Sequence, residues 1–221
     1  MADSVQRFYD LYWRRADSAG PERDPTTPKR ERLLLECLRG LPGVTTVLDA
    51  GCGSGYFLQQ LQRAGYEVAG IDVSDDALAM AKARLGPDAQ LYRHRLDELP
   101  WPLRDESIDV IWSSEVIEHI FGVYEYLAEA NRVLRDRGHL VLTTPFHGRL
   151  KNVVVALLYF DRHFNNIDGG HIRFFTRAAL KALLERFGFT EVRFRTIGRV
   201  PPLAKSMFVI YQKTRTARAA I

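Results

Sequence analysis

Short apolar runs rich in β-branched residues alternate along the chain with segments in which apolar residues recur at helical spacing. The short runs predict seven strands, at residues 45–49, 67–71, 90–95, 107–112, 140–144, 190–197 and 206–212. The helical spacing predicts helices between them, at residues 55–64, 75–85, 123–134 and 176–187. Strands that alternate with helices of this length indicate βαβ units. We therefore expect an α/β fold with a seven-stranded, mostly parallel sheet and helices on both faces.

Local signals refine this outline at three places. Ser74 and Thr176 stand where the N-caps of two predicted helices would lie. The last two strands have Pro201 and Pro202 between them and no helix, which predicts a terminal antiparallel hairpin.

Two segments lie outside the regular alternation. Residues 1–40 hold two predicted helices, at 4–15 and 29–39, and the first carries Tyr9, Tyr12 and Trp13. These aromatics either close over a ligand site or simply pack the helix onto residues 41–221, the main domain. Residues 145–175 form an insertion whose apolar run, 153–160, predicts a small helical cap.

Composition fits one domain of ordinary size. The chain has 221 residues, of which 46% are hydrophobic, so one well-packed core is expected. The net charge of +4 forms no basic stripe, so we expect no nucleic-acid partner. Cys37 and Cys52 have neither disulfide nor metal spacing, and no signal-peptide core or bilayer-length apolar stretch occurs. We expect a cytoplasmic protein without a transmembrane segment.

The most informative segment is a glycine-rich loop after the first predicted strand. It reads VLDAGCGSGYF over residues 47–57, with Asp49 at the strand end and Gly51, Gly53 and Gly55 beyond it. Open α/β sheets bind ligands outside the carboxyl ends of their strands. Glycines there let a ligand approach the backbone closely and permit positive φ. The loop therefore predicts a ligand site at the end of the first strand.

The spacing of the loop separates two classes of cofactor. A dinucleotide fingerprint, GxGxxG/A, seats a pyrophosphate on a helix N-terminus. This chain has Tyr56 and Leu58 where that pattern needs glycine or alanine. The carboxylate of Asp49 would repel a pyrophosphate and attract an ammonium group. The loop favours a ligand with an amino-acid end, and a nicotinamide-dependent oxidoreductase is the alternative.

A second acid, Asp72, ends the second predicted strand. It lies about 20 residues beyond the glycines, where an acid accepts hydrogen bonds from ribose hydroxyls. It also precedes Ser74 and Asp75 at a helix start, where an Asp can serve as a cap. The distance from the glycine loop favours ribose binding.

The chain resembles the class I S-adenosylmethionine-dependent methyltransferases in three stretches, DAGCGSGYF, GIDVS and LPWPLRDESIDVIWSSEVIEHI. It is most similar to the group that includes ubiquinone-pathway O-methyltransferases, over residues 45–213. The resemblance implies a Rossmann-like fold and S-adenosyl-L-methionine as cofactor. It also implies methyl transfer to a small-molecule acceptor, at a hydroxyl or carboxylate oxygen as the first expectation and at nitrogen as the alternative.

The resemblance also implies roles for single residues. Asp49 would hold the methionine amino group, and Asp72 both ribose hydroxyls. Many relatives carry an Asp before the LPW motif for the adenine amine, where this chain has Arg95, so Asp97 or the backbone would replace it. The residues expected at the cofactor are Asp49, Gly51, Cys52, Gly53, Asp72, Val73, Leu96, Asp97 and Ser113.

Acidic residues cluster in SSEVIEHI, residues 113–120, directly after the fourth strand. In a helical turn, Glu115, Glu118 and His119 would share one face and could ligate a divalent cation. A similar ExxEH carries Mg²⁺ in ubiquinone-pathway and small-RNA 2′-O-methyltransferases, whereas other relatives have EVIEHI and use no metal. Without a metal, His119 is a candidate general base, because imidazole titrates near neutral pH.

Two more histidines, His147 and His171, flank the predicted cap. An oxygen nucleophile must lose its proton, so we expect at least one of His119, His147 and His171 to touch the acceptor. The apolar cap favours an aromatic or lipid-like acceptor. A last alternative is a catalytically silent partner subunit, against which the intact acids and glycines of the loop argue. The oligomeric state is left open.

Overall fold

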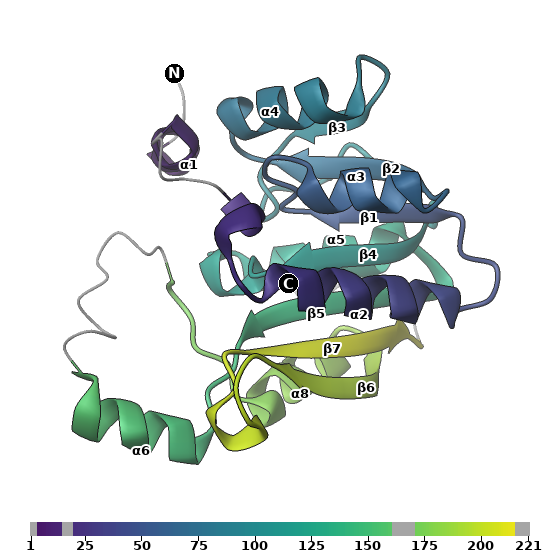
Figure 1. Ribbon diagram of the computed structural model, residues 1–221. Helices are drawn as coiled ribbons and strands as arrows, with labels where there is room; N and C mark the ends of the chain where they lie inside the picture. The colour runs from purple at the N-terminus through teal and green to yellow at the C-terminus, as the bar shows by residue number, and fades with distance from the viewer. Residues whose placement is uncertain (1–3, 15–19, 161–170, 215–221) are drawn as a thin grey trace.

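The computed structural model describes residues 4–14, 20–160 and 171–214, and its centre is one seven-stranded sheet in the order β3-β2-β1-β4-β5-β7-β6 (Figure 1). Strands β1 to β5 run parallel, and β7 lies antiparallel between β5 and β6. The predicted sheet and its terminal hairpin are therefore confirmed. The strands are β1 Thr46–Ala50, β2 Glu67–Asp72, β3 Gln90–Arg93, β4 Ile108–Ser114, β5 Leu134–Pro145, β6 Phe189–Ile197 and β7 Ser206–Lys213.

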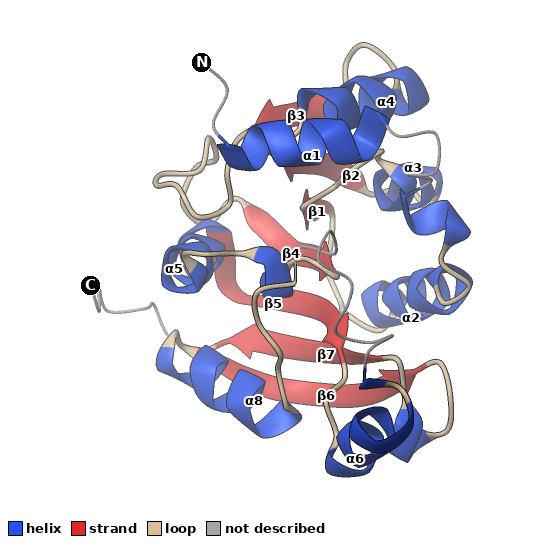
Figure 2. Cartoon of the chain, turned by 90° about the vertical axis from the view of Figure 1, so that its left-hand side faces the viewer, coloured by secondary structure: helices blue, strands red, loops and turns tan. Residues whose placement is uncertain are grey.

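Helices cover both faces of the sheet (Figure 2). On one face, α2 (Thr27–Arg39) and α3 (Tyr56–Arg63) pack with the buried ring of Trp112. On the other, α5 (Val123–Val133) and α8 (Arg177–Arg186) form a second core. Helix α4 (Asp75–Leu85) lies beside α3 and β3. The two cores bury the sheet on both sides, as a parallel sheet requires.

The predicted helix caps are present. The Ser74 hydroxyl accepts a hydrogen bond from the Ala77 N–H at 3.2 Å, and the Thr176 hydroxyl accepts one from the Ala179 N–H at 3.1 Å. Each cap satisfies one backbone donor that has no partner within its helix.

Strand β5 is longer than its apolar run predicts. The predicted strand covered residues 140–144, but β5 begins at Leu134, directly after α5. Leu134 pairs with Ile108 of β4, and the polar residues that follow turn through Arg137, whose φ is +59°. Their polarity hid the extension, because hydrophobic spacing is the main strand signal.

The cap insertion contains α6 (Arg149–Leu158), which lies at the edge of the molecule beyond the strand ends (Figure 1). Residues 161–170 of the insertion, with His163, Asp168, Gly169 and Gly170, lie outside the described residues. Within the described ranges, none of the helices has the length and apolarity needed to cross a bilayer.

Candidate functional site

A cavity of about 690 Å³ opens at the carboxyl ends of β1, β2 and β4. Its volume lies in the range of about 300–1,000 Å³ that is typical of small-molecule sites. Its walls come from the loops after these strands, from α1 (Ser4–Arg14) and from the start of α2. The site therefore forms where ligands of open α/β sheets bind.

The glycine loop forms the floor of the cavity. Gly51 and Gly53 have φ values of +86° and +50°, which strain any other residue type. A Cβ on Gly53 would lie 2.6 Å from the Trp13 ring, and one on Gly51 would lie 2.5 Å from a Val116 methyl. Both glycines are thus required by backbone conformation and by close packing.

Asp49 faces the cavity from the end of β1 and is 1% exposed. Its Oδ2 atom has no hydrogen-bonding partner among the described residues. Burial, and then the nearby charge of Asp72, raise the pKa of Asp49 well above its usual value. A buried carboxylate of this kind calls for a cationic or donating ligand group. The predicted contact with an amino group fits this unpartnered oxygen.

Asp72 lines the same cavity from the end of β2. Its Oδ2 accepts a hydrogen bond from the Gly53 N–H at 2.8 Å, and its Oδ1 accepts one from the Ser74 N–H at 3.0 Å. Burial raises its pKa, and these hydrogen bonds act in the opposite direction. Each carboxylate oxygen has a further lone pair, so Asp72 can hold the glycine loop and still accept from ligand hydroxyls.

The remaining expected cofactor residues divide into two groups. Cys52, Val73, Leu96 and Asp97 line the cavity with the two acids and the glycines. Ser113 is absent from the wall: it is buried, and its hydroxyl donates to the Ala50 carbonyl at 3.0 Å.

Ser114 and Asp97 both line the cavity, and each already has a side-chain partner. Alternation along β4 turns Ser114, in place of Ser113, toward the cavity. The Asp97 carboxylate is already engaged, because Arg95 Nε lies 3.0 Å from its Oδ1 and the Gly122 N–H donates to its Oδ2 at 3.3 Å. These contacts leave less of the carboxylate for the predicted bond to an adenine amine.

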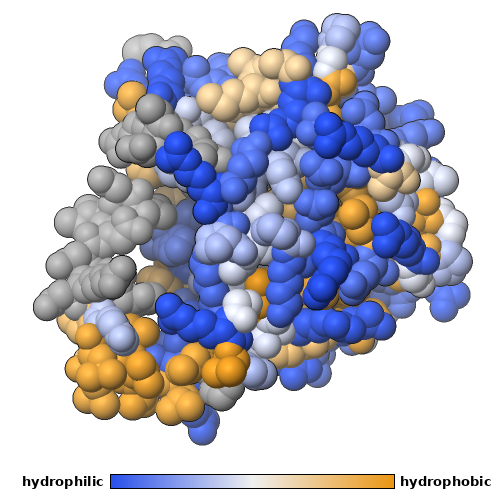
Figure 3. All heavy atoms as spheres, viewed as in Figure 1, coloured by the Kyte–Doolittle hydropathy of each residue, from blue (hydrophilic) through white to orange (hydrophobic). Residues whose placement is uncertain are grey.

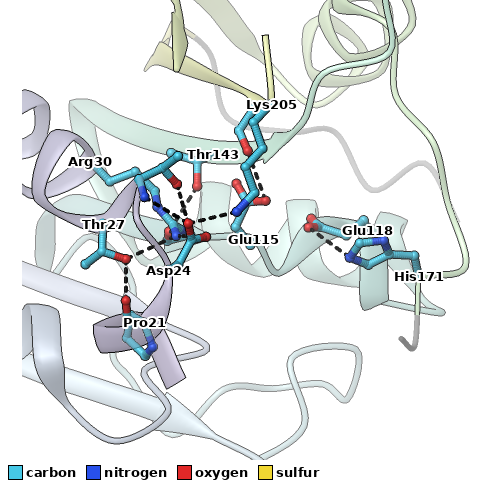
Figure 4. Close-up of polar contacts among 12 residues, drawn as sticks. Pro21, Asp24, Thr27, Arg30, Glu115, Glu118, Thr143, His171 and Lys205 are labelled. Atoms are coloured by element: carbon cyan, nitrogen blue, oxygen red, sulfur yellow. Dashed lines mark hydrogen bonds and ion pairs between the residues drawn. The ribbon is translucent and has the colours of Figure 1, made fainter. Parts of the chain in front are cut away.

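At the other end of the cavity, Glu118, His119 and His171 come together. The Nε2 atoms of His119 and His171 each lie 4.0 Å from Glu118 Oε1, and Figure 4 shows His171 pointing at this carboxylate. Glu118 is fully buried, and its Oε2 accepts a hydrogen bond from Thr144 at 2.9 Å. Burial, followed by the charge of Glu115, raises the pKa of Glu118 well above its usual value. The ligand atoms of these three residues lie within 4.8 Å of one another.

Glu115 does not share a helical face with Glu118 and His119. It remains attached to the sheet, because its N–H donates to the Thr143 carbonyl at 2.9 Å. Its φ of +56° then sends the chain into a short 3₁₀ helix, η2 (Ile117–His119). The structure thus replaces Glu115 by His171 in the predicted cluster. A helical-turn reading could not find this, since His171 is distant in sequence.

His147 does not line the cavity. It is 8% exposed, its ring stands edge-on to Phe174 at 5.0 Å, and its Nδ1 lies 3.3 Å from the side-chain oxygen of Asn152. Of the three expected histidines, His119 and His171 reach the cavity wall.

A charged group that the sequence did not point out completes the wall. Figure 4 shows Asp24 between Arg30 and Lys205, at 2.5 Å and 2.8 Å. Burial would raise the pKa of Asp24, but hydrogen bonds from Lys205 and Thr26 and the charge of Arg30 lower it to about 2. Arg30 is only 4% exposed, and its Nε–H has no acceptor among the described residues.

A signal for Arg30 was present in the sequence. It stands three and four residues before Leu33 and Leu34, so helical spacing places it on the buried face of α2. Lys205 follows the Pro201–Leu203 turn, η4, and had no such signal.

The aromatic residues of α1 form one side of the cavity. Tyr9, Tyr12 and Trp13 all line it, and the Tyr9 ring stands edge-on to His119 at 6.4 Å. Polar contacts hold the helix to the start of α4, including one from Gln6 to Asp75 at 2.7 Å. α1 therefore spans the cavity from the Asp72 end to the histidine end.

Sequence comparisons agree with this geometry. A methyltransferase domain family matches residues 14–193. A probable S-adenosylmethionine-dependent methyltransferase of Mycobacterium tuberculosis is 36% identical over 53% of this chain and 42% of its own length. A ubiquinone biosynthesis O-methyltransferase of Bradyrhizobium diazoefficiens is 32% identical over 55% of this chain and 47% of its own. The matched part thus spans about half the length of these relatives or less.

Solved structures share the fold. The N-methyltransferase NodS of Bradyrhizobium japonicum, in complex with S-adenosyl-L-homocysteine, superposes with a TM-score of 0.72 at 16% identity, covering 96% of this chain and 100% of the other. The 1,6-didemethyltoxoflavin-N1-methyltransferase of Burkholderia thailandensis has a TM-score of 0.70 at 18% identity, covering 96% and 88%. Together with the family match, the fold and the acids at the ends of β1 and β2 identify the chain as a member of the class I S-adenosylmethionine-dependent methyltransferases.

Proposed function

We propose that this protein transfers a methyl group from S-adenosyl-L-methionine to an oxygen of a small-molecule acceptor. The observation that carries the cofactor assignment is that Asp49 and Asp72 face one cavity across a glycine loop. Two carboxylates there oppose the pyrophosphate of a nicotinamide dinucleotide. They suit an amino group and a ribose diol instead.

Arg30 supports the same orientation of the cofactor. An amino-acid end carries a carboxylate beside its ammonium group. Arg30 lines the cavity with Asp49, and its buried Nε–H lacks an acceptor among the described residues. We assign Arg30 to the cofactor carboxylate, since a guanidinium recognises that group well.

For methyl transfer the protein has two main tasks: it aligns the acceptor with the methyl carbon, and it removes a proton from the acceptor. S-adenosyl-L-methionine supplies an electrophilic methyl carbon on a cationic sulfur, and the leaving group is a neutral thioether. The cavity walls would hold the acceptor oxygen in line with that carbon, and reaction requires a separation of roughly 3–3.5 Å. As the new O–C bond forms, the hydroxyl proton passes to an imidazole, either His119 or His171. Glu118 would stabilise the resulting imidazolium.

An amine acceptor is the second candidate. The Oε1 atoms of Glu115 and Glu118 are both buried and have no hydrogen-bonding partner among the described residues, so they could accept from an amine. A neutral amine needs no base, whereas a hydroxyl does. The histidines therefore distinguish the two acceptors.

The test uses histidine variants in an acceptor screen with labelled S-adenosylmethionine. For an oxygen acceptor, His171→Asn or His119→Asn should lower turnover by about 10²–10⁴-fold, the usual contribution of a general base. His147→Asn is the matched control and should leave turnover near the wild-type value. Turnover that survives both cavity variants would favour nitrogen over oxygen.

The predicted Mg²⁺ site does not fit the residues present. Mg²⁺ prefers oxygen ligands in octahedral geometry, and the cluster offers one carboxylate and two imidazoles. We therefore expect EDTA to leave turnover unchanged once an acceptor is known. Loss of turnover that added Mg²⁺ restores would contradict this and return Glu115 to the site.

The apolar part of the cavity wall bears on the class of acceptor. Phe8, Ile120 and Phe121 line the cavity near the histidines. They support the expectation of an aromatic or lipid-like acceptor. The cytoplasmic location likewise stays a prediction, in keeping with two free, buried cysteines.

A further inference from the structure

Helix α6 leaves a row of apolar side chains exposed. Leu150, Val153 and Leu157 recur at helical spacing and are 53%, 53% and 77% exposed. Leu158 and Phe160 continue the patch at 71% and 57% exposure. Figure 3 shows the resulting hydrophobic cluster over α6 at the lower left of the molecule. Single exposed apolar residues are ordinary, but contiguous ones mark an interaction site.

The helix is seated by a different face. Lys151, Val154 and Val155 are partly buried, and α6 contacts the η4 turn. Lys151 anchors the helix, since its ammonium donates to the Phe146 carbonyl at 2.7 Å and, just beyond η4, to the Lys205 carbonyl at 3.3 Å. The helix therefore carries more apolar side chains than those that pack against the domain.

The surroundings of the exposed row are basic. Residues 145–160 and 198–206 hold Arg149, Lys151, Arg199 and Lys205 and no acidic residue. Lys205 is paired with Asp24 at 2.8 Å. Arg149 and Arg199 are both exposed. Arg149 begins α6, and Arg199 stands two residues before η4, the turn that α6 contacts.

We propose that this surface docks on a membrane that contains anionic lipids. The surface is named the α6 face and consists of Leu150, Val153, Leu157, Leu158, Tyr159, Phe160 and the exposed Val200, with Arg149 and Arg199 beside them. An apolar stripe flanked by basic residues is the pattern of a helix lying in the lipid interface. With 10 residues, α6 is about 15 Å long, half of what a bilayer core requires.

A membrane fits the charges better than a second copy of the chain. A two-fold dimer through the α6 face would bring two copies of the same basic patch together, so four arginines would share one contact region. Like charges at such a contact oppose association. Anionic headgroups attract the same arginines.

Docking would also bring the site close to the lipid. Lys205 lines the cavity, and it follows the η4 turn on which α6 rests. The cavity would therefore open near the membrane surface, where an apolar acceptor dissolves. That consequence rests on the proposed function, whereas docking itself does not.

The experiment is sedimentation of the full chain with vesicles, which needs neither cofactor nor acceptor. One set is phosphatidylcholine alone, and the other is an equal mixture of phosphatidylcholine and phosphatidylglycerol. We expect binding to the mixed vesicles that weakens with added salt. Leu157→Ser with Leu158→Ser should weaken it at least tenfold, because burial of one leucine is worth about that much.

Two further variants sharpen the result. Arg149→Glu with Arg199→Glu should also reduce binding to the mixed vesicles at least tenfold, since each basic residue contributes about fivefold. Val192→Ser, at a 55% exposed position on β6, is the matched control and should bind like wild type. Unchanged melting temperatures would show that the variants are folded.

Three outcomes would overturn the proposal. Wild type that sediments with neither vesicle would do so, and so would an equal loss in Val192→Ser. The third is a wild-type dimer that the leucine variant converts to monomer without a change in vesicle binding. If S-adenosylhomocysteine failed to bind while vesicle binding persisted, only the proposed function would fall.

Discussion

Asp49→Asn is expected to weaken binding of S-adenosylhomocysteine by about tenfold to a hundredfold while stabilising the ligand-free protein. A hydrogen bond between charged groups is worth about 1.5–3 kcal/mol, which sets the loss in affinity. The gain in stability has a different origin. The Asp49 carboxylate is buried beside Asp72, and its Oδ2 has no partner within the described structure. A neutral amide removes that desolvated charge.

The same substitution should reduce a pH dependence, leaving only the part that comes from Asp72. Burial and Asp72 raise the pKa of Asp49 in the folded protein, so Asp49 takes up a proton as the pH falls. Cofactor affinity in the wild type should therefore fall toward acid pH. Stability should change in the opposite direction, because the folded state holds this proton more tightly than the unfolded one. The charged Asp49 carboxylate destabilises the folded state fully above its raised pKa, and this destabilisation disappears below the usual pKa of Asp.

Calorimetric titration and thermal melts between acid and slightly alkaline pH measure both effects. The control is Asp109→Asn, which lies outside the cavity. Asp109 accepts hydrogen bonds from the N–H groups of Thr45 and Thr46 at 2.9 Å, and its pKa is lowered, with these hydrogen bonds outweighing burial. Its loss should destabilise the fold and leave affinity alone. If Asp49→Asn behaves in the same way, the assignment of Asp49 to the ligand fails.

Gly53→Val is expected to abolish cofactor binding without unfolding the domain. The φ of +50° costs a side-chain-bearing residue about 1–2 kcal/mol. The added Cβ would also lie 2.6 Å from Trp13, so the indole must move. The extra methyl groups then occupy the floor of the cavity, where the ligand needs bare backbone.

Gly43→Val is the control that separates the effect of backbone strain from the effect of blocking the cavity. Gly43 has a φ of +73°, and a Cβ there would meet nothing within 4 Å. Gly43→Val should lose the free energy of unfolding that corresponds to the strain alone, and Gly53→Val at least as much, both measured with urea. Only Gly53→Val should fail to bind S-adenosylhomocysteine. Equal affinities in the two variants would argue that the loop does not contact the ligand.

Periodicity predicted most of the fold, and the strand-end acids predicted which side chains line the cavity at the ends of β1 and β2. Asp49 and Asp72 were predictable because parallel strands deliver their last residues to one edge of the sheet. Ser113 was misplaced by one position, since a single residue along a strand reverses the direction of the side chain.

The rest of the cavity wall depended on contacts between distant parts of the chain. His171 reaches Glu118 from beyond the cap, and Asp24 and Lys205 meet although 181 residues separate them. Helical periodicity also could not predict that Glu115 adopts a left-handed conformation at the end of β4. Local pattern predicts elements, whereas such pairs arise from the packing of the whole domain.

The most direct measurement is a calorimetric titration of the full chain with S-adenosylhomocysteine, alongside a fluorescence titration with NADH. Two acids at one glycine-floored cavity predict saturable binding of S-adenosylhomocysteine at a single site and no binding of NADH. Binding of NADH, with no heat from S-adenosylhomocysteine, would contradict this account.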